Sequence, residues 1–317
     1  MDKNKKLFIS VVIPTCNRPN TLMKCIESII SNNYQNCEII VVDQSDNSET
    51  YVQLKKKFYA DEIIKYLHSD IKCSSDSRNK GWQKASGAIV AFTDDDAYVV
   101  DGWLDAYSVA FSDENPRIGM VGGRVEPVYQ IPRPSWLPHE KDYLLPSFDA
   151  GTEMKEFPPE SLPISVNFAL RRTVLEATGG FDTRLGLKKA AKNPYIGGED
   201  SFLAKKIKDS GYFILYQPSA IVYHPVTAAR LTRKFFIKRN FREGITAIAL
   251  ENAKNRCNKD ELSSHMKWHI NRFLHYGRLL MRDFIIKKRP EACMLQVAEM
   301  AYSAGAVHHA YYLMKNL

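Results

Sequence analysis

Three adjacent aspartates, Asp94, Asp95 and Asp96, follow an apolar run in the stretch FTDDDAYV, residues 92–99. Adjacent carboxylates repel one another, so a positive charge is needed to offset them. The hard cations Mg²⁺ and Mn²⁺ bind carboxylate oxygens and often keep waters and substrate phosphates as further ligands. The D-x-D pair of Asp94 and Asp96 therefore predicts a divalent cation site. The alternative is a helix N-terminus capped by aspartate, which needs only one such residue.

A second pair of carboxylates, Glu199 and Asp200, follows two glycines in GGEDSF, residues 197–202. The glycines permit a tight approach of a ligand to the backbone. A carboxylate within hydrogen-bond reach of a hydroxyl can act as a general base. The alternative is again structural, because acids are favourable in the first turn of the helix that begins here.

The predicted elements bring these carboxylates to one edge of a sheet. Apolar runs predict strands at residues 7–13, 37–43, 62–68 and 88–93, and helical spacing predicts helices at residues 21–31 and 74–86. This alternation indicates an α/β fold with a mainly parallel, Rossmann-like sheet flanked by helices. Ligands bind such sheets beyond the carboxyl ends of the strands, where both Asp43 and Asp94 are expected.

The later part of the chain is organised differently. Residues 126–163 contain eight prolines and little periodicity, which predicts an irregular loop that serves as a lid or acceptor wall. A helix is expected at residues 199–212 and two strand-like pieces at residues 213–225. We therefore expect an α/β domain over residues 1–227 and a basic helical C-terminal region over residues 228–317.

The basic residues are concentrated in the C-terminal region. The chain has 317 residues and a net charge of +8, and residues 228–317 carry 17 basic and 7 acidic side chains. In residues 230–290, Arg and Lys are interleaved with aromatic side chains. This pattern is typical of a helix on an anionic membrane surface and equally of a helical cap with a solvated basic face. We expect no nucleic acid as partner, because no motif for it is present.

The composition is that of an ordinary globular protein, with 44% hydrophobic and 25% charged residues. No apolar run reaches the roughly 18 residues of a membrane span, and the N-terminus does not have the pattern of a signal peptide. The six cysteines are scattered without CxxC spacing, which indicates reduced thiols and no structural zinc. We expect a cytoplasmic protein, and the basic region leaves open a peripheral position at the inner face of the membrane.

Seven short motifs resemble, in order, those of the inverting glycosyltransferases of family 2, of the non-processive bacterial type. They are VVIPTCNRP (11–19), VVDQSD (41–46), SRNKG (77–81), FTDDDA (92–97), NFALRR (167–172), GGFD (179–182) and GGEDSF (197–202). The resemblance implies a GT-A catalytic domain over residues 1–227. The QxxRW segment of processive polysaccharide synthases is missing, which implies that single sugars are added.

The resemblance also implies roles for individual residues. Pro14 and Thr15 would border the nucleotide, Asp43 would hydrogen-bond its base, and Arg78 would lie near its phosphates. These four positions follow from the motifs at the ends of the first two strands and in SRNKG.

A Mn²⁺ or Mg²⁺ ion among the three aspartates is a further implication of the resemblance. Asp96 would be the main ligand, Asp94 would contact the ribose or the metal, and Asp95 could share either task. His224, in VYHP, resembles a histidine that completes the metal shell in some relatives. Its alternative is a strand-end histidine bonded to the backbone.

Inverting transfer requires a base that takes the proton of the acceptor hydroxyl. The resemblance assigns this role to Asp200, with Glu199 contacting the acceptor or orienting the site. Asp182 of GGFD and Asn167 are further candidates, near the donor sugar and the acceptor. GGFD also reads as a helix C-cap followed by a turn.

The motifs predict a metal-dependent inverting glycosyltransferase. It would move one sugar from a nucleotide-diphosphate sugar, a UDP-sugar by resemblance, to a hydroxyl of a glycan or lipid-linked saccharide in cell-surface polysaccharide synthesis. One alternative is a non-catalytic nucleotide- or glycan-binding partner of another transferase, which the intact Glu199–Asp200 pair disfavours. Another is a sugar nucleotidyltransferase, which would need a Gly-rich loop where PTCNRPN stands.

Overall fold

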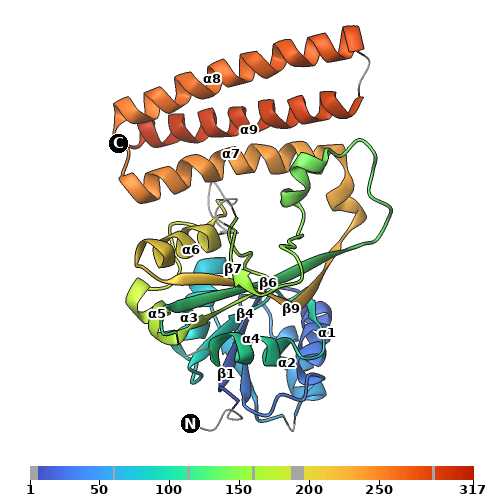
Figure 1. Ribbon diagram of the computed structural model, residues 1–317, viewed down its shortest axis with the longest axis vertical. Helices are drawn as coiled ribbons and strands as arrows, with labels where there is room; N and C mark the ends of the chain where they lie inside the picture. Colours follow the sequence, from blue (N-terminus) through green and yellow to red (C-terminus); the bar gives the residue numbers. More distant parts are fainter. Residues whose placement is uncertain (1–5, 60, 113–114, 159–160, 187–195, 288–289) are drawn as a thin grey trace. The chain divides into compact units, whose positions relative to one another are not determined.

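The computed structural model describes residues 6–59, 61–112, 115–158, 161–186, 196–287 and 290–317. Its contacts divide the chain into two compact units, both visible in Figure 1. The sheet unit comprises residues 1–127, 146–190 and 199–225, and the helical unit comprises residues 128–145, 191–198 and 226–317. Part of the Pro-rich stretch predicted as a loop, residues 128–145, thus belongs to the helical unit.

The sheet unit is built on a sheet of nine strands. They are β1 (Ile9–Thr15), β2 (Cys37–Asp43), β3 (Ile64–His68), β4 (Ile89–Phe92), β5 (Tyr98–Val99), β6 (Ile118–Tyr129), β7 (Lys155–Glu156), β8 (Phe168–Arg171) and β9 (Phe213–Val226). Their order is β3-β2-β1-β4-β8-β6-β9-β5, with β7 paired to β9. The first four strands are parallel, and β8 pairs with β4 and β6 in antiparallel register. The predicted α/β fold is confirmed.

The prediction of two separate pieces at residues 213–225 was wrong, because these residues form the single strand β9. The strand contains Pro218 and Pro225. Both lie outside the stretches of β9 that pair with β5 and β7. Proline is tolerated in a strand where its missing N–H is not needed for the ladder.

Six helices cover the two faces of this sheet. They are α1 (Pro19–Ile30), α2 (Glu49–Lys57), α3 (Ser74–Gln83), α4 (Trp103–Ser112), α5 (Arg172–Thr178) and α6 (Glu199–Asp209). Successive strand residues point to opposite faces, so Val11 of β1 packs with α1, α2 and α4. Its neighbour Val12 packs with α3, α5 and α6. Burial on both faces explains why the central strands are continuous apolar runs.

The helical unit contains three long helices, α7 (Arg233–Asn255), α8 (Lys259–Arg282) and α9 (Pro290–Lys315), which lie side by side in Figure 1. Shorter helical turns are η1 (His139–Leu144), η2 (Ala228–Leu231) and η3 (Asp283–Lys287). Gly244 and Gly305 let α7 and α9 approach closely, because a Cβ at Gly305 would lie 1.8 Å from the carbonyl oxygen of Phe241. In the described part of the chain, no helix is long and apolar enough to cross a membrane.

Candidate active site

The loop after β4 carries the three aspartates, and the central one points inward. Asp95 is 5% exposed; its Oδ2 accepts a hydrogen bond from Thr15 Oγ1 at 2.6 Å, and its Oδ1 lies 3.1 Å from Arg18 Nη1. Burial raises the pKa of Asp95 to about 6; the Thr15 hydrogen bond and the Arg18 charge lower it, and Asp96 and Asp94 add to the rise. Asp95 therefore fastens the loop to the end of β1.

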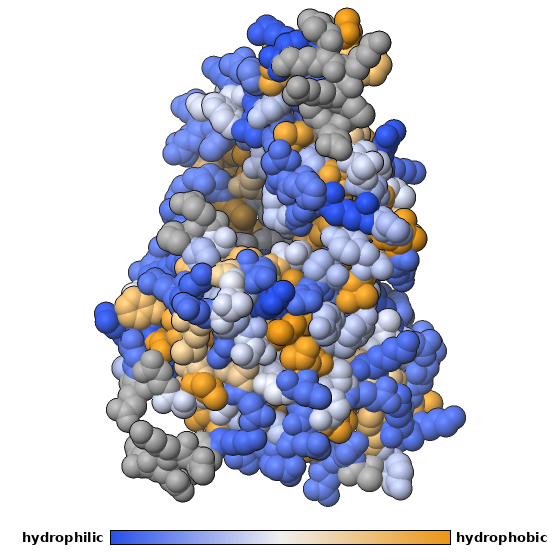
Figure 2. Space-filling model, turned by 45° about the vertical axis from the view of Figure 1, so that its right-hand side comes forward, coloured by the Kyte–Doolittle hydropathy of each residue, from blue (hydrophilic) through white to orange (hydrophobic). Residues whose placement is uncertain are grey.

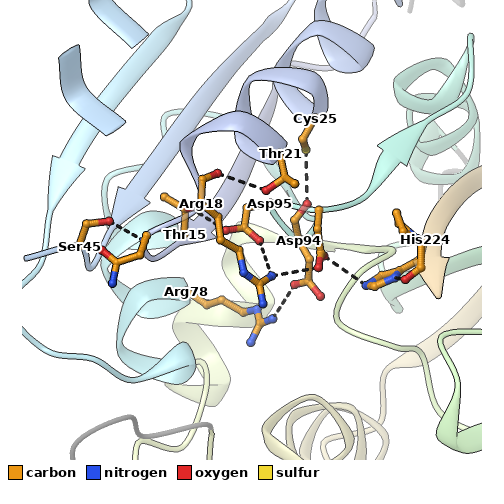
Figure 3. Close-up of polar contacts among 12 residues, drawn as sticks. Thr15, Arg18, Thr21, Cys25, Ser45, Arg78, Asp94, Asp95 and His224 are labelled. Carbon is orange, nitrogen blue, oxygen red and sulfur yellow. Dashed lines mark hydrogen bonds and ion pairs between the residues drawn. The ribbon is translucent and has the colours of Figure 1, made fainter. Parts of the chain in front are cut away.

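The two neighbours of Asp95, Asp94 and Asp96, lie close to a histidine from β9. One ligand atom each of Asp94, Asp96 and His224 can be chosen so that all three lie within 4.8 Å of one another. His224 Nε2 lies 3.3 Å from Asp96 Oδ1, and its Nδ1 lies 3.0 Å from the carbonyl oxygen of Pro225. Figure 3 shows the imidazole directed at the aspartates.

The protonation of His224 follows from its partner on Nδ1. A carbonyl oxygen can only accept a hydrogen bond, so Nδ1 carries a proton and Nε2 is the ring nitrogen that faces Asp96 Oδ1. Two acceptors that face each other at 3.3 Å require a proton or a cation between them. Two carboxylates and an imidazole are a donor set that suits Mn²⁺. The residues present thus fit a divalent metal, and His224 makes both the backbone bond and the contact expected of a ligand.

Two arginines approach the aspartates from the side away from His224, as Figure 3 shows. Arg18 Nη1 lies 2.9 Å from Asp96 Oδ2, and Arg78 Nη2 lies 3.1 Å from Asp94 Oδ1. Arg18 was not among the predicted site residues. Its place in the loop directly after β1, at the carboxyl edge of the sheet, was the available signal.

Arg78 joins the two groups of carboxylates. Its side chain is 4% exposed, and its Nη1 lies 2.8 Å from Glu199 Oε1, which also accepts from Ser74 Oγ. Burial lowers the pKa of Arg78, but the charges of Glu199, Asp94 and Asp200 outweigh it and raise the pKa. Arg78 is therefore a permanent cation at the centre of the site, and Glu199 is its buried counter-ion.

Asp200 lies at the start of α6, beside Glu199. Its Oδ2 accepts from the backbone N–H of Ser165 at 3.1 Å, and its Oδ1 accepts from that of Ser201 at 2.7 Å. These donors orient the carboxylate. A carboxylate oxygen can accept more than one hydrogen bond, so Asp200, which is only half-buried, keeps capacity for a ligand hydroxyl.

A pocket lies at the ends of β2 and β3, near the buried Asp43. Ser45 and Tyr66 donate hydrogen bonds from their hydroxyls to Asp43 at 2.5 Å and 3.0 Å. Both also line the pocket, of about 390 Å³, with Asp46, Asn47, Ser48, Tyr51 and His68. Burial, with Asp43 as hydrogen-bond partner, raises the pKa of Tyr66. Pro14 and Thr15 pair with Val42 and Asp43 across the β1–β2 ladder.

The two further candidates have internal partners. The carboxylate of Asp182 contacts Arg184 through both oxygens, and the hydrogen bond from Arg184 lowers the pKa of Asp182. Gly179 caps α5 with φ of 73°, as the C-cap reading of GGFD predicted.

Asn167 is 1% exposed and uses its whole amide within the sheet unit. Its Oδ1 accepts from Trp103 Nε1 and the Tyr107 hydroxyl, and its Nδ2 donates to the carbonyl oxygens of Arg124 and Ala220. These bonds join α4, β6, β8 and β9. The sequence pattern contained no signal for this structural task, because its partners are distant in the chain.

Comparisons with known proteins agree with this geometry. Residues 10–179 match the family described as glycosyl transferase family 2, so the chain belongs to that family. It is 25% identical over 249 residues to the glucosyl-dolichyl phosphate glucuronosyltransferase of Haloferax volcanii, covering 77% of each chain. It is 28% identical to glycosyltransferase AglE of the same organism, over 75% of this chain and 72% of that one.

The fold also has a close counterpart among solved structures. The mannosyltransferase PcManGT from Pyrobaculum calidifontis, solved with GDP-Man and Mn²⁺, superimposes with a TM-score of 0.65 and 17% identity, covering 98% of this chain and 89% of that one. The protein is thus a family 2 glycosyltransferase with the GT-A fold, as its motifs predicted.

Proposed function

We propose that the protein transfers one sugar, with inversion, from a nucleotide-diphosphate sugar to a hydroxyl of a lipid-linked saccharide, in a metal-dependent reaction of cell-surface polysaccharide synthesis. The convergence of Asp94, Asp96 and His224 carries the proposal, because these three side chains can hold the ion that a diphosphate needs. Arg78 supplies a second positive charge beside them.

The donor is a UDP-sugar in this proposal. The pocket lined by Ser45 and Tyr66 has room for a nucleotide base at the carboxyl ends of β2 and β3. Asp43 accepts hydrogen bonds from both hydroxyls, so it can position the polar edge of the base through these two side chains. A nucleotide-sugar donor used together with a metal is supported by PcManGT, which was solved with GDP-Man and Mn²⁺.

The leaving diphosphate is stabilised by the charges around it. A Mn²⁺ or Mg²⁺ ion held by Asp94, Asp96 and His224 would act as a Lewis acid and stabilise the negative charge that develops on the diphosphate. Arg78 is held in place by Glu199, so its guanidinium needs no reorganisation as that charge develops.

Asp200 is the general base in this proposal. It takes the proton of the acceptor hydroxyl while the hydroxyl oxygen forms a bond to the anomeric carbon and the bond to the diphosphate breaks. The Ser165 and Ser201 amides hold the carboxylate in a fixed orientation. Glu199 keeps Arg78 in position rather than taking the proton, because it is buried as the counter-ion of Arg78, whereas Asp200 is only half-buried.

The acceptor is a lipid-linked saccharide. The Haloferax volcanii relative, covered over 77% of its length, is named for a glucosyl-dolichyl phosphate, which supports an acceptor of this class. Such an acceptor stays at the membrane, so we infer that the enzyme works as a peripheral protein at the inner face.

Calorimetric titration with UDP, GDP, CDP and dTDP, each with Mn²⁺, with Mg²⁺ or with EDTA, tests this proposal. We expect UDP to bind only with metal, and Asp96→Ala to abolish that binding. Asp101→Ala removes an exposed carboxylate from the same region and serves as the control. Binding that persists in EDTA would refute the metal site, and no binding of any diphosphate would favour a non-catalytic partner.

A further inference from the structure

Helix α8 exposes a stripe of apolar side chains in the helical unit. The α8 stripe consists of Ile270, Phe273, Leu274, Met281, Phe284 and Ile285, which are between 36% and 72% exposed. The first four recur at spacings of three, one and seven residues, so they share one side of the helix. The last two continue it into η3. A contiguous apolar face of this kind marks an interaction site.

The stripe borders a groove between α8 and α9. The groove has a volume of about 320 Å³ and is lined by Ile270, Phe273, Leu274, Ala304, Val307 and His308. Beyond it, α9 exposes Tyr311 and Tyr312. The apolar surface therefore extends from one helix to the next within this unit.

The charges beside the stripe have one sign. Residues 262–282 contain no Asp or Glu, and Lys267, Arg278 and Arg282 are exposed there. Asp283 is 4% exposed and binds Arg282. In Figure 2, apolar orange residues lie next to strongly hydrophilic blue ones at the end of the helical unit where α8 turns toward α9. An apolar stripe with basic flanks matches the acyl boundary and the phosphate headgroups of an anionic bilayer.

The two basic segments expected from the sequence have different structures. In α7, Phe236 is buried and packs with Leu231 and Ala298 inside the helical unit, while Arg233 and Lys234 remain exposed. This matches the helical-cap alternative. Helix α7 exposes one large apolar residue, Ile237, whereas α8 exposes the row of them that forms the α8 stripe. Residues 288 and 289 of the expected segment lie outside the described residues.

We propose that the α8 stripe with Lys267 and Arg278 docks the protein on an anionic phospholipid bilayer. The proposal deepens the lipid-linked acceptor of the proposed function by naming the surface that meets the membrane. A second copy of the chain is disfavoured as occupant, because a two-fold interface through the stripe would bring the basic residues beside one stripe near those of the other copy, with no Asp or Glu in residues 262–282 to offset them.

Sedimentation of the full chain with vesicles tests the proposal, without nucleotide, metal or acceptor. We expect binding to vesicles of phosphatidylglycerol and phosphatidylethanolamine and little binding to phosphatidylcholine alone. Leu274→Glu/Met281→Glu should weaken the partition coefficient about tenfold or more, since it places charge where apolar area enters the membrane. Arg278→Glu should weaken it less, and most at low salt.

Val52→Glu in α2 is the matched control, because Val52 is 56% exposed outside the stripe. Circular dichroism and urea unfolding verify that each variant is folded. Equal vesicle binding by the control and the double variant, or no binding by the wild type, would overturn the proposal. A dimer in light scattering that the double variant dissolves would also overturn it. Because the vesicle assay involves no transfer, its failure would leave the proposed activity standing.

Discussion

The carboxyl edge of the sheet and the layer of three helices both contain buried charge, but they balance it differently. At the sheet edge, Arg18 and Arg78 face five carboxylates, those of Asp94, Asp95, Asp96, Glu199 and Asp200. In the helical unit, Glu299 lies 2.7 Å from Lys141 and also pairs with Arg272, whose guanidinium packs over the rings of Trp268, Tyr276 and Tyr302.

This difference separates function from stability. Carboxylates that outnumber the nearby cations repel one another until a metal ion and a ligand bind. Such unfavourable local arrangements are typical of functional sites. The Glu299 carboxylate, by contrast, has its charge offset within the protein by Lys141 and Arg272. Substitutions at the sheet edge should therefore affect mainly activity, and substitutions around Glu299 should affect mainly stability.

The largest effect is expected for Asp200→Asn, which removes the base and keeps the shape of the side chain. We expect kcat to fall about a thousandfold, with unchanged UDP binding and an unchanged melting temperature. Steady-state transfer kinetics measure the effect. Asp209→Asn, at the exposed end of the same helix, is the control, and transfer at the normal rate by Asp200→Asn would exclude it as the base.

Glu299→Ala tests the other side of the comparison. It leaves Lys141 without its carboxylate partner in a buried setting, which costs about 3 kcal/mol of unfolding free energy. Urea unfolding followed by circular dichroism measures the loss, and the half-buried Glu251→Ala in α7 is the control. If Glu299→Ala keeps its stability and loses transfer activity instead, Glu299 does not have the structural role inferred for it.

A smaller effect is expected from pH in the helical unit. Burial lowers the pKa of His269 and His309 to about 4, against about 6.5 in the unfolded chain. Above pH 6.5 both rings are neutral in either state. As the pH falls from 6.5 toward 4, the unfolded chain binds protons that the folded chain excludes, so the contribution of these two rings to the free energy of unfolding decreases.

The midpoints of urea unfolding between pH 7 and pH 4.5 measure how stability depends on pH, that is, the slope of the free energy of unfolding against pH. His309→Gln should flatten it, whereas His275→Gln, at an exposed position of α8, should leave it unchanged. A slope that His309→Gln leaves unchanged would contradict the burial of the neutral ring, because the opposite contribution of Asp95, whose pKa is about 6, is common to the wild type and the variant.

The smallest effect is expected for Arg18→Ala. Arg18 is half-exposed and occupies Asp96 Oδ2 in the absence of a metal, so it competes with the cation for that oxygen. Its removal should raise the affinity for Mn²⁺ alone about fivefold, the scale of an exposed ion pair. Paramagnetic resonance of free Mn²⁺ measures the affinity, with Arg184→Ala as the control. A weaker affinity for Mn²⁺ would show that Arg18 supports the metal site.

The sequence by itself determined the α/β order, the strand ends and the two groups of carboxylates. Apolar runs followed by Asp43 and Asp94 are local signals, and local periodicity was sufficient to locate β1 to β4 and the helices α1 and α3, whereas α2 was not predicted. The DDD and GGEDSF motifs could be recognised for the same reason, since each is contiguous in the chain.

Only the tertiary structure decided which side chains meet. Arg78 contacts Glu199, His224 faces Asp96, and Asn167 joins four elements, all across separations of more than forty residues. The structure also decided that α7 buries Phe236 whereas α8 exposes Trp268 and Phe273. Both helices have interleaved basic and aromatic residues, and what distinguishes them is the partner against which each packs, which no local pattern records.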